Sequence, residues 1–285
     1  MVIDLHAHTA FSDGTQSPSE LVSEASMEGI DVVGITDHDT TAGWAPAEEA
    51  ARVYGLGLVR GMEISCRHEG VSVHLLSYLH DPYATGLASV VEETRRSRLD
   101  RTHLIIDRLA EDYPIDMDAV LSVAGEDATI GRPHIADALV AAGIVETRSE
   151  AFASILSSHG KYHVTLPTID PITAIRLIAE AGGVSVFAHP RAAMRGLVVS
   201  DAAMREFIAA GLDGLEVDHR DNPPNEREVM RRLAHDNDLI VTGSSDYHGT
   251  GKPNRLGEHS TSEHMLAKLL DRAASRPGGV EFIQG

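Results

Sequence analysis

Short apolar runs rich in β-branched residues alternate along the chain with longer segments of helical periodicity. The runs are VIDL at 2–5, VVGIT at 32–36, LGLVRGME at 56–63, VSVHLLSYL at 71–79, GVSVFAH at 183–189, GLEVDH at 214–219 and LIVTGSSD at 239–246. Runs of this length predict strands, and strands separated by helical segments predict repeated βα units around a parallel sheet. The pattern therefore predicts an α/β barrel with seven strands.

Between residues 80 and 182 the strand pattern almost disappears. Residues 90–112 (VVEETRRSRLDRTHLIIDRLAED) read as a helix, and so does GRPHIADALVAAG at 131–143, where Pro133 suits the first turn and Gly143 the end. We therefore predict that residues 1–80 and 183–285 form the barrel. Residues 81–182 are predicted to form an inserted, mainly helical cap subdomain.

Length and charge narrow the classes of partner. A chain of 285 residues can hold one barrel with an insertion. Its 43 acidic and 24 basic side chains give a net charge of −19, which opposes loose binding to duplex DNA or to an anionic membrane. Cys66 is the only cysteine, and no leader or long apolar run is visible, so we expect a cytoplasmic protein. The sequence does not indicate an oligomeric state.

Histidines and carboxylates gather where the predicted strands end. In a closed parallel barrel these ends share the face on which barrel active sites lie. Residues two apart on a strand point to the same side, as His6 and His8 would. The candidate metal ligands are His6, His8, Asp13, His38, Glu63, His74, His189, Asp246 and His248.

Six histidines and three carboxylates exceed the four ligands of a closed structural zinc site. We expect two or three divalent ions, and Mn, Fe and Zn all suit this donor set. Three such ions beside three carboxylates leave a local charge of about +3, which would attract a phosphate dianion. Clustered ions can also lower the pKa of a bridging water, so that the hydroxide attacks phosphorus in line.

In this order HAH at 6–8, TDHD at 36–39, GMEIS at 61–65, His74, AHP at 188–190 and SDYH at 245–248 resemble the PHP family, the polymerase and histidinol phosphatase group. The resemblance implies a distorted (β/α)7 barrel whose trinuclear site hydrolyses phosphate esters. It also implies three ligand sets, which are His6, His8, Glu63 and Asp246; Glu63, His74 and His189; and Asp13, His38 and His248.

Within that family, GRPHIADALVAAG followed by HGKYHV at 159–164 resembles stand-alone members that act on nucleotides and short RNA ends. The resemblance implies release of the 3′-phosphate from nucleoside 3′,5′-bisphosphates, with short 5′-phosphorylated RNA as a further substrate. A cyclic sugar phosphate and a histidinol-phosphate-type monoester stay open as alternatives. The alternative outside the enzymes is a non-catalytic module that holds metal ions or senses a nucleotide.

Several basic residues are candidates for gripping the substrate. An arginine fork suits two phosphate oxygens, so Arg132 is a candidate catalytic residue together with His219 and Asp246. Arg132 and His134 could instead cap a helix of the cap subdomain. Lys252 could instead be a solvated lysine in a surface loop. The candidate phosphate contacts are Arg132, His134, Lys161, Arg191, His219 and Lys252.

Three further aspartates have expected supporting roles. Asp37 is expected to orient a histidine from outside the ligand set, and Asp4 is a second candidate for that role. Asp39 directly precedes a helical segment and is expected to cap it.

Overall fold

The computed structural model describes residues 1–125 and 127–285. Seven strands form one sheet in sequence order, and Ala7 meets Tyr247 to bring the last strand against the first. The predicted seven-stranded barrel is therefore confirmed. The strands are β1 (Ile3–Ala7), β2 (Val32–Ile35), β3 (Gly57–His68), β4 (Val71–Tyr78), β5 (Val184–Phe187), β6 (Gly214–Asp218) and β7 (Ile240–Gly243).

The barrel departs from a parallel arrangement at β4, which runs antiparallel to both β3 and β5. A tight hairpin joins β3 to β4, with Glu69 and Gly70 at φ 47° and 85°, as a two-residue turn with two positive φ angles requires. The prediction of a βα unit here was wrong. So was the prediction that Glu63 ends its strand, because β3 continues to His68.

Helices cover the outside of the barrel because each has one apolar face to bury. In α1, Ser17 and Glu20 form a reciprocal capping box ahead of the buried Leu21 and Val22. The four residues of β2 are all buried, as expected for a strand covered on both faces. The outer helices are α1 (Pro18–Met27), α2 (Trp44–Tyr54), α7 (Pro171–Glu180), α8 (Asp201–Ala209), α9 (Pro224–Asp236) and α10 (Glu263–Ala274), and the 3₁₀ helix η1 spans Ala193–Arg195.

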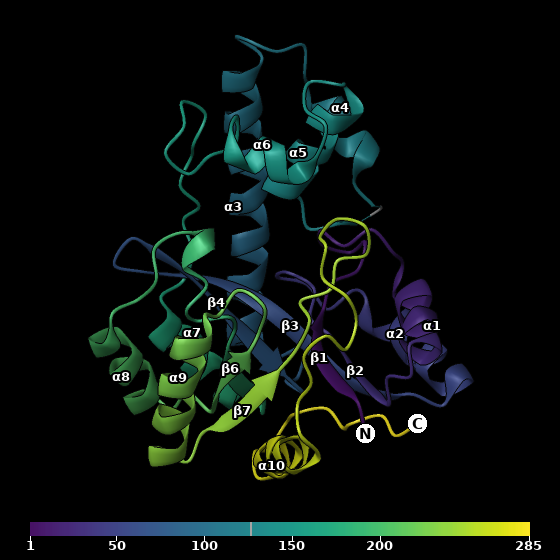
Figure 1. Ribbon diagram of the computed structural model, residues 1–285, viewed down its shortest axis with the longest axis vertical. Coiled ribbons are helices and arrows are strands. Elements are labelled where there is room, and N and C mark those ends of the chain that lie inside the picture. The colour runs from purple at the N-terminus through teal and green to yellow at the C-terminus, as the bar shows by residue number, and fades with distance from the viewer. Residues whose placement is uncertain (126) are drawn as a thin grey trace.

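Four helices build a cap with its own apolar core, and the longest of them begins on the barrel, where Leu87 packs into the barrel core (Figure 1). The helices are α3 (Thr85–Leu109), α4 (Met117–Val123), α5 (Arg132–Ala141) and α6 (Arg148–Ala153). The predicted helix that starts near Pro133 and ends before Gly143 is confirmed as α5. The range 81–182 for the cap stays a prediction, and its last helix, α7, packs into the barrel core instead.

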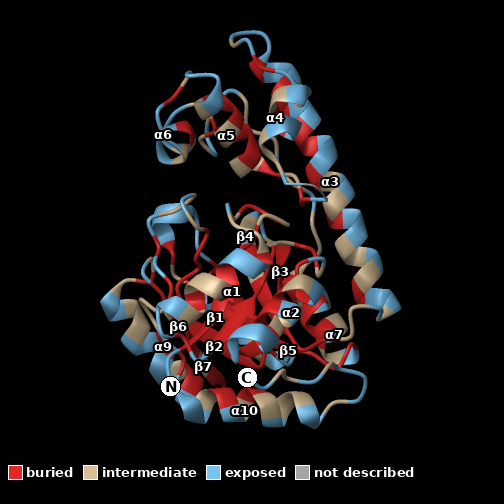
Figure 2. Ribbon diagram, turned by 90° about the vertical axis from the view of Figure 1, so that its right-hand side faces the viewer, coloured by how far each residue is buried: buried red, intermediate tan, exposed pale blue. Residues whose placement is uncertain are grey.

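The cap lies over one end of the barrel, and both chain termini lie at the other end (Figures 1 and 2). Several hydrogen bonds and ion pairs among the described residues join the two parts. Thr129 donates its N–H to the carbonyl oxygen of Phe11 at 2.9 Å. Arg148 donates to the carbonyl oxygen of Asp13 at 2.9 Å. Arg98 pairs with Asp39 at 2.8 Å, so the long helix α3 is tied directly to the barrel mouth.

No helix among the described residues is both long and apolar enough to cross a membrane.

The cap core generates a stability prediction. Leu139 is fully buried in it, so we expect Leu139→Ala to lower the free energy of unfolding by about 2–5 kcal/mol. Leu121→Ala on α4 is the matched control, because that side chain is 50% exposed and should change stability by no more than about 0.5 kcal/mol. Urea unfolding followed by circular dichroism measures both. Equal effects of the two substitutions would mean that the cap core does not contribute as described.

Candidate metal centre

All nine predicted ligands lie at the barrel end that faces the cap. His6 lies in β1, and His8 follows it with the same side-chain direction. Asp13 lies in the next loop, where a Cβ on Gly14 would come within 2.2 Å of the His8 carbonyl oxygen. Only a glycine therefore lets this loop fold back against β1. His74 reaches the same end from the first half of β4, because that strand runs in the opposite direction.

Glu63 is the residue that the surrounding histidines share. Its Oε2 lies 3.1 Å from Nε2 of His8 and 3.2 Å from Nδ1 of His38. Its Oε1 lies 2.8 Å from Nδ1 of His74 and 3.2 Å from Nε2 of His189. The side chain of Glu63 is only 1% exposed, so this charge has little water around it.

The ligand-type atoms form three compact groups, each with all atoms within 4.8 Å of one another. The group around His6 matches the first set implied by the resemblance. The group around Asp13 matches the third set with His8 added, and the remaining group has His38 where the resemblance implies His189. The groups are His6, His8, Glu63 and Asp246; His8, Asp13, His38 and His248; and His38, Glu63 and His74.

Unpartnered polar atoms in these groups fit bound cations. Oδ1 of Asp13 and Nε2 of His248 lie 3.2 Å apart, yet each is buried without a hydrogen bond to any described residue. The same holds for Nδ1 of His38. Leaving buried polar atoms unpaired costs free energy, and a divalent ion between them would remove that cost. Nitrogen and carboxylate donors suit Mn, Fe or Zn.

Protons and cations compete for this site. Burial lowers the pKa of His8, but Asp246 and Glu63 outweigh that effect and raise it to about 9. In contrast, burial together with the charge of Lys252 lowers the pKa of His248 to about 4. The carboxylates therefore hold positive charge at one part of the centre even when no ion is bound, and metal binding must displace that proton.

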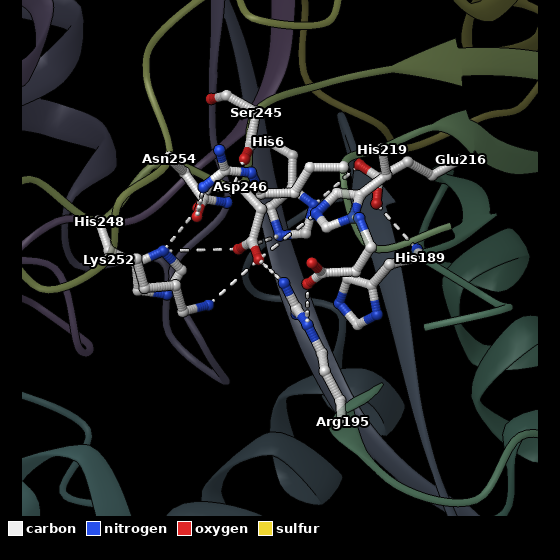
Figure 3. Close-up of polar contacts among 12 residues, drawn as sticks. His6, His189, Arg195, Glu216, His219, Ser245, Asp246, His248, Lys252 and Asn254 are labelled. Atoms are coloured by element: carbon white, nitrogen blue, oxygen red, sulfur yellow. Dashed lines mark hydrogen bonds and ion pairs between the residues drawn. The ribbon is translucent and has the colours of Figure 1, made fainter. Parts of the chain in front are cut away.

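Glu216 is a supporting residue that sequence reasoning missed. Nδ1 of His6 lies 2.9 Å from one of its oxygens, and the backbone N–H of His189 donates to the other at 2.8 Å (Figure 3). Such a contact orients a ligand histidine and leaves Nε2 facing the centre. The available signal was an acidic residue inside the apolar run GLEVDH.

Arg195 also escaped sequence reasoning. It donates to Oδ2 of Asp246 at 2.6 Å and to Asp221 at 2.6 Å. Lys252 donates to the same oxygen of Asp246 at 3.1 Å, and Nε2 of His219 lies 3.6 Å from it (Figure 3). Basic groups therefore gather on the outer oxygen of Asp246, where phosphate oxygens would also be attracted. Arg195 is the last residue of the short 3₁₀ helix η1, and the sequence around it has no helix or strand pattern that would have placed it.

The other predicted phosphate contacts are more scattered. His134 is buried and accepts the Gly131 N–H at the start of α5, and it borders a cavity of about 270 Å³ between the cap and the barrel. Lys161 is exposed and pairs with Glu111 and Asp112, away from the centre.

Arg191 is committed to contacts beside its own loop. It donates to the carbonyl oxygen of Val199 at 2.8 Å and pairs with Asp201 and Glu226. Arg132 donates weakly to the carbonyl oxygen of Leu156, at 3.4 Å.

The three supporting aspartates have distinct partners. Asp37 accepts from Thr9 and from the hydroxyl of Ser12, which lies 3.4 Å from Nδ1 of His8. Asp4 instead accepts the N–H groups of Ser245 and Gly257, and so holds the segment after β7.

The expected capping role of Asp39 was wrong. The N-cap residue of α2 is Gly43, and Asp39 accepts from Ser65 and Arg98.

Glu216→Gln should weaken Mn²⁺ binding about 10- to 100-fold, because an amide has one acceptor oxygen for two donors that now share a carboxylate. Isothermal titration calorimetry measures the dissociation constant. Glu206→Gln on the exposed side of α8 is the control and should bind as the parent does. Unchanged affinity in the Glu216 variant would show that this carboxylate does not support the site.

Comparisons with known proteins agree with this geometry. A sequence profile of the PHP domain matches residues 4–156. A 5′-3′ exoribonuclease of Haemophilus influenzae is 34% identical over 86% of this chain and 89% of its own length. A phosphoribosyl 1,2-cyclic phosphate 1,2-diphosphodiesterase of Eggerthella lenta is 29% identical, over 87% and 95%. A 3′,5′-nucleoside bisphosphate phosphatase of Chromobacterium violaceum is 29% identical, over 90% and 91%.

A crystal structure from Bifidobacterium adolescentis, provisionally described as a metal-dependent phosphoesterase, has 48% sequence identity and a TM-score of 0.93. The match covers 95% of this chain and 96% of that one, so cap and barrel are both included. The resemblance inferred from the sequence motifs is confirmed. This chain belongs to the PHP family and is a metal-dependent phosphoesterase.

Proposed function

We propose that the enzyme releases the 3′-phosphate of nucleoside 3′,5′-bisphosphates, and that short RNA with a 5′-phosphate is a second substrate class. The observation that carries the proposal is the position of the cap. Its helix α3 is tied to the barrel mouth by the pair of Arg98 with Asp39. Helix α5 starts beside that pair with Arg132, because a Cβ on the preceding Gly131 would lie 3.1 Å from Nη1 of Arg98. A substrate at the centre would meet positive charge on two sides.

The nine clustered residues are proposed to hold two or three divalent ions, which when bound would lower the pKa of a water molecule and neutralise phosphate charge. Arg195 and Lys252 are placed to contact the oxygens of the phosphate that is removed. His219 is fully buried, and its Nε2 has no hydrogen bond to any residue that the structure describes, so it can donate a proton or a hydrogen bond to the departing 3′-oxygen. Arg132 and His134 are proposed to contact the far part of the substrate.

A cyclic sugar phosphate is the second candidate. The relative from Eggerthella lenta carries that activity in its name and aligns over a similar share of the chain. A cyclic sugar phosphate is also hydrolysed at a phosphate ester, so the metal centre serves either substrate. What differs is the group that the cap must recognise.

The charge of −19 supports small phosphorylated molecules and short oligonucleotides as partners rather than duplex DNA. A cytoplasmic location stays a prediction.

Substrate choice is tested with the manganese-loaded protein and four esters: adenosine 3′,5′-bisphosphate, AMP, a 1,2-cyclic ribose phosphate and histidinol phosphate. Phosphate release should give the bisphosphate a kcat/KM that exceeds the others by about 100-fold, or roughly 2.7 kcal/mol. Chelation should abolish turnover. If the cyclic phosphate is preferred, the second candidate replaces the first.

A further inference from the structure

One of the three ligand groups depends on loops as well as on strands. We call it the Asp13 position, and its members are His8, Asp13, His38 and His248. His8 directly follows β1, and His38 forms a bridge with Glu63 of β3, so the sheet holds both. Asp13 and His248 lie in the loops after β1 and β7. Their placement therefore needs contacts from outside the sheet.

Arg148 of the cap contacts both of these loops. Its Nη1 donates to the backbone carbonyl oxygen of Asp13 at 2.9 Å. The same Nη1 lies against Gly251, where an added Cβ would come within 2.3 Å of it. The guanidinium therefore occupies the space that a side chain at this position would fill. The two loops also bind each other, since Thr15 donates its N–H to the carbonyl oxygen of His248 at 3.2 Å.

Asp137 fixes the direction of this guanidinium. Nε and Nη2 of Arg148 donate to the two carboxylate oxygens of Asp137, which lies on α5. A bidentate pair holds the planar guanidinium in one orientation, with Nη1 directed at Asp13. The Arg148 side chain is only 14% exposed, so solvent screens this pair less than a surface pair. Helices α5 and α6 of the cap therefore act on the barrel loops through one side chain (Figure 1).

We propose that Arg148, oriented by Asp137, is a positioning residue for the Asp13 position, and that the cap sets the affinity of that position for a divalent ion through it. Without Arg148, the carbonyl oxygen of the buried Asp13 loses its donor, and the loop must shift to find another. Such a shift moves the Asp13 carboxylate away from Nε2 of His248, which now lies 3.2 Å from it. The proposal rests on the metal binding proposed above, but not on the identity of the ester.

Arg148→Met tests the assignment, because it removes the guanidinium and keeps a long side chain. Arg96→Met, on the exposed face of α3, is the matched control. Calorimetric titration of the metal-free proteins with Mn²⁺ should show one class of site weakened about 10- to 100-fold in the Arg148 variant and none in the control. Titration curves of the Arg148 variant that match those of the parent overturn the assignment.

A double substitution separates positioning from general support of the fold. Asp13→Ala removes a ligand of the Asp13 position itself, so that position should already be weak in this variant. Adding Arg148→Met should then change Mn²⁺ affinity less than about twofold, because both substitutions act on one position. A purely structural link between cap and barrel would give effects that add, or would weaken the sites around Glu63 equally. Either of these results overturns the assignment.

Gly251→Ala displaces Arg148 without changing its chemistry. The added methyl group takes the place of Nη1, which is the end of a flexible side chain and can move aside. Mn²⁺ affinity should fall as it does in Arg148→Met, and combining the two substitutions should lower it no further. Affinity equal to that of the parent in the Gly251 variant would contradict the positioning role. Thermal unfolding of the metal-free proteins is the folding control for every variant.

Linkage makes the coupling between cap and ion reciprocal. If the cap strengthens ion binding at the Asp13 position, an ion bound there must stabilise the docked cap by the same factor. Mn²⁺ should therefore slow amide hydrogen exchange in α5 and α6 of the parent more than in the Arg148 variant. An effect of Mn²⁺ on exchange that is equal in both proteins would mean that Arg148 does not transmit the coupling.

The outcomes also distinguish this inference from the proposed function. If Mn²⁺ affinity depends on Arg148 as expected but the nucleoside bisphosphate is not the preferred ester, the substrate assignment fails and the positioning role stands. If the bisphosphate is preferred and Mn²⁺ binding is unaffected by Arg148→Met, the positioning role fails alone. A protein that binds no Mn²⁺ overturns the positioning role together with the proposed metal binding.

Discussion

A single buried carboxylate, that of Glu63, organises the catalytic end of this barrel. One of its oxygens faces His8 and His38, and the other faces His74 and His189. Such a charge is tolerated in a protein interior only when positive charge or a metal compensates for it. Because β4 runs antiparallel to β3 and pairs with it beyond Glu63, it places His74 beside this carboxylate.

The charge of the whole protein and the charge of the active end have opposite signs. The chain carries a net −19, yet Arg195 and Lys252 both donate to Asp246, and Arg98 reaches from the cap to the barrel mouth. A low-dielectric pocket strengthens these local fields relative to distant surface carboxylates, which salt screens. A small phosphorylated molecule can therefore be attracted to the active end even though the protein as a whole is negatively charged.

Much of the fold could be predicted from the sequence because its strands are buried on both faces and appear as continuous apolar runs. Strand direction could not be predicted, because the order of apolar and polar residues does not depend on it. The antiparallel direction of β4 was missed for that reason. His6 and His8 could be placed together from their spacing alone. Glu216 and Arg195 could not, because their partners lie far away in the sequence. Lys161 was assigned to phosphate from its charge, and the structure shows acidic neighbours that its sequence context did not reveal.

The central claim is that Glu63 is shared between metal ions, and anomalous diffraction from crystals grown with manganese tests it most directly. We expect at least two manganese peaks within coordination distance of the Glu63 carboxylate, with His6, His8 and Asp246 around one and His74 around another. A single ion, or ions bound away from Glu63, would contradict the account.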